Sequence, residues 1–298
     1  MNHNVSNQEL YEALKSAIHL EKPFSYVRIG DGELAFLARP EHFKTKEEWY
    51  IVRSTLKSVC RRYWKDYFLK YDHDHPSNNS EFIVSFREII KDTISASDYL
   101  GLFSKDTIDN LVEIGSLKEE KREEWYNHYI PKPRIFTDAG IDLKSLKICN
   151  PLFSRYPEIG NIDNFKRLVQ TRPITILTSN RRLEDNKKFH ELLGKQSTVY
   201  YYGKSPKSGE KGGLRTYWQR DSIKELIPHI KDHIVLYALG GGGKDLCHIL
   251  KNDYGKCVID MGSTIDAWAG NIPRPRFKTV WKHCLSVPVS EAIIKSDR

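Results

Sequence analysis

Apolar residues recur along the chain in two spacings, which predict two kinds of element. Short runs rich in aromatic and β-branched residues predict strands at 24–29, 99–103, 174–178, 199–202, 233–239 and 256–260. Stretches with apolar residues three or four positions apart predict helices, among them 6–20, 45–70, 105–114, 117–129, 214–230 and 244–251. Because strands and helices alternate, most clearly in the second half, we expect a mostly parallel sheet covered by helices, that is, a Rossmann-like α/β fold.

Other predictions concern short elements and the capping of a helix. Short strands are expected at 82–84 and 134–136, with a helix over 86–94 between them. Ser6 is expected to cap the first helix, with Glu9 completing a capping box. We find no internal repeat and no linker-like stretch, so we expect one domain over residues 1–298.

The first candidate site is the turn that follows the strand at 24–29. Two glycines bracket an aspartate there, and a helical pattern begins at Glu33. The carboxyl edge of a parallel sheet is where such folds bind ligands, and the carboxylates of Asp31 and Glu33 are hard oxygen ligands suited to Mg²⁺ or Mn²⁺. A plain polar turn that starts a helix is the alternative. The residues that this segment offers to a ligand are Arg28, Gly30, Asp31, Gly32 and Glu33.

A second glycine-rich turn follows the strand at 233–239 and leads into a helix. Backbone N–H groups at such a place favour a phosphate, so a diphosphate cradle is expected. The turn lacks the residues of a Walker A loop and of a full dinucleotide fingerprint. A turn that only packs closely is the alternative. The cradle residues would be Gly240, Gly241, Gly242 and Lys244.

Further polar residues follow other predicted strands. Asn180 and Arg182 stand where a base, ribose or phosphate could be bound, although an N-cap with solvated arginines explains them equally well. Asp260 and Asp266 follow the last strand and could position a sugar hydroxyl or act as a general base, with turn capping as the alternative. Asp138 is a further candidate base. The basic loop at 203–213 has the composition of a mobile lid, whereas 72–75 is expected to be a solvated loop and no metal site.

Composition narrows the class of protein. The 298 residues carry a formal charge of +8, with basic and acidic residues interleaved along the chain. This charge favours anionic partners, including an anionic membrane surface, but no RNA- or DNA-binding signature accompanies it, so no nucleic acid is expected. No apolar run approaches the roughly 20 residues of a membrane span, and no signal peptide is visible. Five scattered cysteines are expected to be reduced thiols in a cytoplasmic protein.

The two glycine turns and the last strand together resemble the GT-D type bacterial glycosyltransferases. The resemblance is carried by Arg28–Glu33, Leu239–Gly240 and Val258–Gly262. It implies a Rossmann-like single domain that uses a nucleotide sugar, with Asp31 and Glu33 holding a divalent metal and the diphosphate. The chain departs from the family pattern after Gly240, and again at Ser263–Asp266.

The resemblance implies a metal-assisted transfer from a nucleotide-sugar donor, such as a UDP-sugar, to a glycan, glycolipid or glycoprotein acceptor of the bacterial surface. The expected cofactor is Mn²⁺ or Mg²⁺, and the expected location is the cytoplasm, with peripheral contact at the inner face of the membrane. The alternative is a non-catalytic nucleotide- or phosphate-binding regulatory protein. A metal-dependent phosphoesterase is less favoured, because no His-rich two-metal pattern is present.

Overall fold

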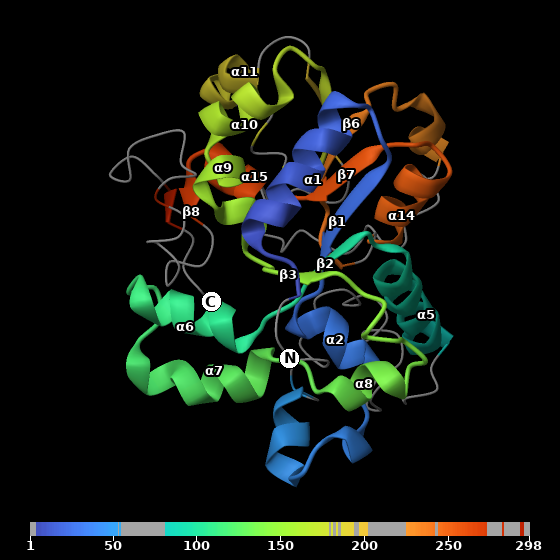
Figure 1. Cartoon of the computed structure of the whole chain (residues 1–298), viewed down its shortest axis with the longest axis vertical. Helices are drawn as coiled ribbons and strands as arrows, with labels where there is room; N and C mark the ends of the chain where they lie inside the picture. The colour runs from blue at the N-terminus through green and yellow to red at the C-terminus, as the bar shows by residue number, and fades with distance from the viewer. Residues whose placement is uncertain are drawn as a thin grey trace, which may run out of the picture.

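The structure is a computed structural model of the chain (Figure 1). It describes residues 4–52, 54, 81–178, 180, 183, 186–193, 197–201, 225–241, 244–272, 282 and 293–294, and it describes the backbone alone at 31, 40, 81–85, 272 and 293–294. Most of the predicted helix at 45–70, the loops at 72–75 and 203–213, and most of the predicted helix at 214–230 lie outside these residues.

A seven-stranded parallel sheet forms the centre of the fold, as the alternation of elements predicts. Its order is β3-β2-β1-β7-β6-β4-β5. The strands are β1 (Phe24–Arg28), β2 (Tyr99–Gly101), β3 (Ile148–Cys149), β4 (Ile174–Thr178), β5 (Thr198–Tyr201), β6 (Ile234–Ala238) and β7 (Cys257–Asp260). A separate pair joins β8 (Asn271–Ile272) to β9 (Ile293–Ile294). The order places β1, from the start of the chain, directly beside β7.

Successive strand residues point to opposite faces of the sheet, and this alternation divides the core into two apolar clusters. Leu236 and Ile259 belong to one cluster, whereas Val235 and Val258 belong to the other. The first cluster includes residues of α1 (Asn7–His19), α6 (Lys105–Glu113), α7 (Arg122–Tyr129), α9 (Pro157–Gly160), α10 (Ile162–Val169), α11 (Lys187–Leu193) and α15 (Thr264–Trp268). The second includes residues of α2 (Asp31–Leu37), α5 (Glu81–Ala96), α8 (Pro133–Thr137) and α14 (Asp245–Asn252).

Helices therefore cover both faces of the sheet, as a parallel sheet requires. Figure 1 shows α5 and α14 beside each other on the right and α9, α10 and α11 together at the upper left. Short 3₁₀ turns complete the described elements: η1 (Pro40–His42), η2 (Glu119–Lys121), η3 (Phe153–Arg155) and η6 (Ile227–His229). Within the described parts of the chain, no helix combines the length and apolarity needed to cross a membrane.

Two predicted strands are helices in the structure. Residues 82–84 lie inside α5, where Phe86, Ile90 and Ile94 are buried at a spacing of four, so one helical face continues through the whole segment. Residues 134–136 lie inside α8, which begins with Pro133. Proline is tolerated in the first turn of a helix, because the backbone N–H group that it lacks would have no acceptor within the helix there. Both predictions relied on short apolar runs that helix and strand share.

Other local predictions are confirmed. Ser6 accepts a hydrogen bond from Glu9 N, and Glu9 accepts one from Ser6 N, which completes the capping box of α1. The described part of the helix predicted over 45–70 is helical at residues 46–52, and Thr45 accepts a hydrogen bond from Glu48 N at its start. The segment from 148 to 169, for which no element is predicted, contains β3, η3, α9 and α10.

Candidate active site

Three neighbouring strands end at one place on the carboxyl edge of the sheet. These are β1, β7 and β6, and both glycine turns extend from this edge. The turn after β1 leads into α2, and the turn after β6 leads into α14. Because all three strands are parallel, their last residues lie side by side, and residues more than two hundred positions apart come into contact.

Arg28 and Asp260, the last residues of β1 and β7, form an ion pair at this edge. Arg28 Nη2 lies 2.9 Å from Asp260 Oδ1, and Arg28 N donates a hydrogen bond of 3.2 Å to Oδ2 of the same carboxylate. Asp260 therefore holds both the side chain and the backbone of Arg28, and the cation predicted to bind a ligand has an internal partner.

Lys244 joins this pair from the second glycine turn. Its Nζ lies 3.0 Å from Asp260 Oδ2 and 3.4 Å from Glu33 Oε1, and it also donates a hydrogen bond to the carbonyl oxygen of Arg28. Arg28, Glu33, Lys244 and Asp260, which we call the charge cluster, thus comprise two cations and two anions. The side chains of Lys244 and Asp260 are 6% and 3% exposed, whereas those of Arg28 and Glu33 are each 16% exposed.

Mutual attraction keeps the members of the charge cluster ionised despite their burial. Burial by itself would raise the pKa of Asp260, but Arg28 and Lys244 outweigh it and hold the pKa below its ordinary value. Burial would lower the pKa of Lys244, but Asp260 and Glu33 reverse the effect and raise it. The pKa of Arg28 is likewise raised, because Asp260 opposes the effect of burial.

Glu33 sits between the two glycine turns. Its Oε2 accepts a hydrogen bond of 3.0 Å from Gly30 N. A Cβ atom on Gly30 would lie 3.0 Å from Oε2, and one on Gly241 would lie 3.0 Å from Oε1. The close approach that glycine permits at these two positions therefore accommodates the protein's own carboxylate, in contrast to the open diphosphate cradle that the sequence predicts.

Gly262 approaches Arg28 in the same way. Its φ of +48° lies in the left-handed region that favours glycine, and a Cβ atom there would overlap Arg28 Nη2 and lie 2.9 Å from Arg28 Cζ. Gly262 is absent from the predicted site residues, although a glycine shortly after a strand is a signal that could have found it. Tyr237, also not predicted, supports the turn after β6, because its hydroxyl donates a hydrogen bond of 2.7 Å to Gly240 O.

A second polar contact joins the segment after β4 to α15, the helix that follows β7. Asn180, which follows β4, donates a hydrogen bond from Nδ2 to Oδ1 of Asp266 in the first turn of α15. Asn180 is buried and Asp266 is partly exposed. The structure thus brings together two predicted residues that are far apart in sequence, one after β4 and one after β7.

Other predicted residues have different positions. Gly32 is the second residue of α2, and Gly240, with a φ of +78°, lies within the second glycine turn. Asp138 follows a helix in place of the predicted strand, and it contacts His42 Nε2 at 3.1 Å and Arg134 Nε at 3.3 Å. The side chain of Asp31, and Arg182 and Gly242 as a whole, lie outside the described residues.

The described side chains offer a partial fit to the divalent metal that the family pattern implies. They include no group of three or more His, Cys, Asp or Glu that could hold an ion. Glu33 is the carboxylate of the charge cluster with solvent access, and each of its oxygens keeps a lone pair beyond the contacts it makes. A metal at this edge would therefore need Asp31, water or substrate oxygens as further ligands.

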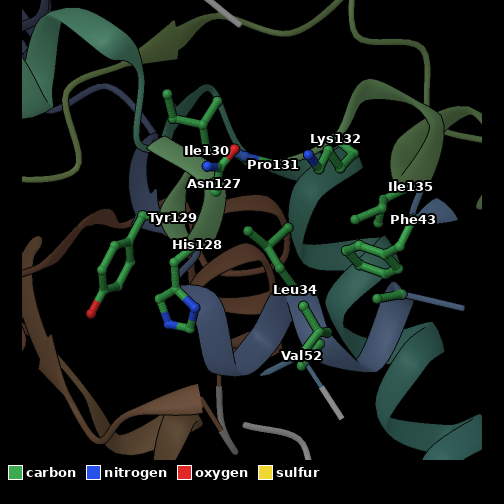
Figure 2. Close-up of a pocket in the computed structure, with 12 residues that line it drawn as sticks. Leu34, Phe43, Val52, Asn127, His128, Tyr129, Ile130, Pro131, Lys132 and Ile135 are labelled. Atoms are coloured by element: carbon green, nitrogen blue, oxygen red, sulfur yellow. The ribbon is translucent and has the colours of Figure 1, made fainter. Parts of the chain in front are cut away.

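A pocket lies on another side of α2 (Figure 2). It measures about 430 Å³, part of which is open to solvent. Figure 2 shows Leu34, Val52 and His128 among the side chains of its wall. No residue of the charge cluster lines it, although Leu34 directly follows Glu33 in the chain.

We expect acid to reduce the contribution of Asp260 to stability. Because its folded-state pKa lies below the ordinary value of 3.8, this contribution is present above pH 3.8 and is lost as the pH falls through the folded-state pKa. Urea unfolding of the wild type and of Asp260→Asn should show a difference in unfolding free energy that is constant near neutrality and narrows below pH 3.8. A difference that widens in acid would contradict the assignment.

Comparison with known proteins agrees with this architecture. The family described as the GT-D fold-like domain matches residues 5–268, which include β1 to β7 and both glycine turns. No curated protein and no solved structure matches the chain. Since the family match covers most of the sequence, the chain belongs to the GT-D-like family.

Proposed function

We propose that the protein is a glycosyltransferase that moves a sugar from a nucleotide-sugar donor, such as a UDP-sugar, to a glycan, glycolipid or glycoprotein acceptor. The observation that carries the proposal is the convergence of Arg28, Glu33, Lys244 and Asp260 where β1, β7 and β6 end, in a chain of the GT-D-like family. Open α/β sheets bind their ligands at this edge.

The donor diphosphate is proposed to lie beside Asp31 and Glu33. Glu33 would present a carboxylate oxygen whose orientation is already fixed by Gly30 N and Lys244. A Mn²⁺ or Mg²⁺ ion bound by these two residues would supply Lewis-acid neutralisation of the leaving diphosphate. Arg28, partly exposed at the same edge, would add positive charge near the phosphates.

The nucleoside or the transferred sugar is proposed to contact Asn180 and Asp266. Their amide and carboxylate are suited to hydrogen bonds with a base or a hydroxyl group. Of Asp260, the last residue of β7, and Asp266, in α15, we propose Asp266 as the proton acceptor. Asp260 is almost fully buried, two cations contact it, and its lowered pKa makes it a weak base.

The basic charge of the chain supports a further proposal about the acceptor. A formal charge of +8 favours contact with an anionic lipid surface or a phosphate-linked acceptor. We therefore propose peripheral contact with the inner face of a membrane, where a lipid- or glycan-linked acceptor would be presented. Sedimentation with anionic and with neutral vesicles would test it, and equal binding to both would contradict it.

Calorimetric titration with UDP-, GDP-, TDP- and CMP-sugars, with and without Mn²⁺, tests the proposed function. We expect one donor to bind in a metal-dependent way to the wild type, and its affinity to fall at least tenfold in Asp31→Ala/Glu33→Gln, since both carboxylates are removed. Glutamine retains an oxygen that can accept from Gly30 N, so the start of α2 is preserved.

Glu113→Ala is the control, because this exposed residue at the end of α6 lies outside the site. It should bind the donor as the wild type does. Absence of binding to every donor by the folded wild type would refute the proposal. Donor binding without transfer or hydrolysis, tested with a panel of acceptors, would favour the non-catalytic nucleotide-binding alternative.

A further inference from the structure

Lys244 is the residue of the charge cluster that connects the most elements. Its Nζ contacts Asp260 at the end of β7, Glu33 in α2 and the carbonyl oxygen of Arg28 at the end of β1. Its own position is the N-cap of α14. One ammonium group therefore links two strands and two helices at the proposed donor site.

We propose that Lys244 is a positioning residue that fixes the carboxylate of Glu33, and that Asp260 holds Lys244 in place for this purpose. The inference rests on the proposed function, because it assigns Glu33 to the donor site. It gives Lys244 a role different from the phosphate contact that a lysine after a glycine turn indicates in sequence. Lys244 would act on the donor through Glu33 and would not touch it.

The hydrogen-bonding capacity of Lys244 supports this role. An ammonium group has three N–H donors, and three protein oxygens lie around Nζ, namely Asp260 Oδ2 at 3.0 Å, Glu33 Oε1 at 3.4 Å and Arg28 O. Two of these donors form hydrogen bonds, to Asp260 and to the carbonyl oxygen of Arg28, and the third faces the ion-paired Glu33. With its side chain only 6% exposed, Lys244 is poorly placed to contact a bound phosphate directly.

The surroundings of Glu33 show what Lys244 adds. Gly30 N fixes Oε2, and Lys244 approaches Oε1 from the opposite turn. The backbones of Gly30 and Gly241 limit the space on both sides. A carboxylate held in this way loses little rotamer freedom when a ligand binds, so its orientation contributes to affinity.

Lys244→Met tests the inference, with Lys251→Met as the matched control. Lys251 lies on the same helix and is also an ion-paired lysine, 2.9 Å from Asp98 and 2.9 Å from Ala96 O, but it does not belong to the charge cluster. We expect Lys244→Met to weaken donor binding about 10- to 100-fold, the usual effect of removing a group that orients a ligand-binding side chain. Lys251→Met should bind the donor as the wild type does.

Titration with Mn²⁺ alone separates orientation from simple repulsion. If Lys244 orients Glu33, Lys244→Met lowers the affinity for Mn²⁺. If Lys244 is only a nearby positive charge, removing it raises that affinity. A rise would overturn the inference.

A double-mutant cycle with Glu33→Gln identifies the route of the effect. If Lys244 acts through Glu33, the loss of donor affinity in Lys244→Met/Glu33→Gln should be close to that of Glu33→Gln alone. If the loss of donor affinity in the double variant equals the sum of the losses in the two single variants, expressed as free energies, Lys244 contacts the donor itself. That result would overturn the inference. If Lys244→Met does not fold, Lys244→Gln is used in the same cycle.

The outcomes distinguish this inference from the proposed function. A wild type that binds no nucleotide sugar refutes the proposed function and, with it, the role of Lys244. A wild type that binds the donor as proposed, together with a Lys244→Met variant that behaves like Lys251→Met, refutes the positioning role alone.

Discussion

Gly262→Ala is expected to destabilise the protein by at least about 3 kcal/mol, because several costs coincide at this position. The φ of +48° is unfavourable for alanine. The new Cβ atom would overlap Arg28 Nη2, so the guanidinium group must move. Arg28 cannot move freely, since Asp260 holds it at 2.9 Å, and displacement would break a nearly buried ion pair. Urea denaturation with a probe of tertiary structure measures the effect.

Gly255→Ala separates the strain of a positive φ from the contact between the new Cβ atom and Arg28. Gly255 also has a positive φ, +64°, but no atom of the described residues lies within 4 Å of the place that a Cβ atom would take there. Alanine at this position should cost about 1 kcal/mol, the strain of the backbone alone. Similar losses in both variants would show that contact between Gly262 and Arg28 contributes nothing.

Asp260→Asn is expected to cost about 3–5 kcal/mol at neutral pH, the usual effect of removing one partner from a buried ion pair. Asparagine has nearly the shape of aspartate, so packing is preserved while the negative charge is lost. Arg28 and Lys244 would then share the single negative charge of Glu33, and they would remain enclosed at the ends of β1 and α14. Equilibrium unfolding in urea measures the loss, which is large relative to typical domain stability.

An exposed ion pair provides the comparison for Asp260→Asn. Glu124 contacts Lys121 at 2.7 Å on the surface, and both side chains are more than half exposed. Glu124→Gln should leave the unfolding transition unchanged, because solvent screens such pairs. If Asp260→Asn also leaves the unfolding transition unchanged, the charge cluster does not stabilise the fold.

The sequence is a good guide where one local pattern has one structural meaning. The capping residues of α1 and the apolar runs of β4, β6 and β7 allow few alternatives, and these elements are confirmed. It misleads at 82–84 and 134–136, where the same short apolar runs fit a strand or a buried helix face. Packing against the sheet decides between the two, and packing is not local information.

The residues of the candidate site could be predicted from the sequence, whereas the contacts between them could not. Residue type and position, at the end of a strand or in the turn after it, were enough to predict that Arg28, Glu33, Lys244 and Asp260 lie at the carboxyl edge of the sheet. Sequence could not reveal that these residues contact one another, because β1 and β7 become neighbours only through the crossover order of the sheet.

The sequence by itself therefore determined the class of fold and the edge of the sheet at which charged residues gather. It also indicated glycines in the turns at that edge, where a side chain can come close to the backbone. Only the tertiary structure decided that Gly241 and Gly262 make room for Glu33 and Arg28, and that Lys244 is enclosed. The physical reason is that periodicity and turn chemistry act over a few residues, whereas the pairing of buried charges depends on which strand ends lie side by side.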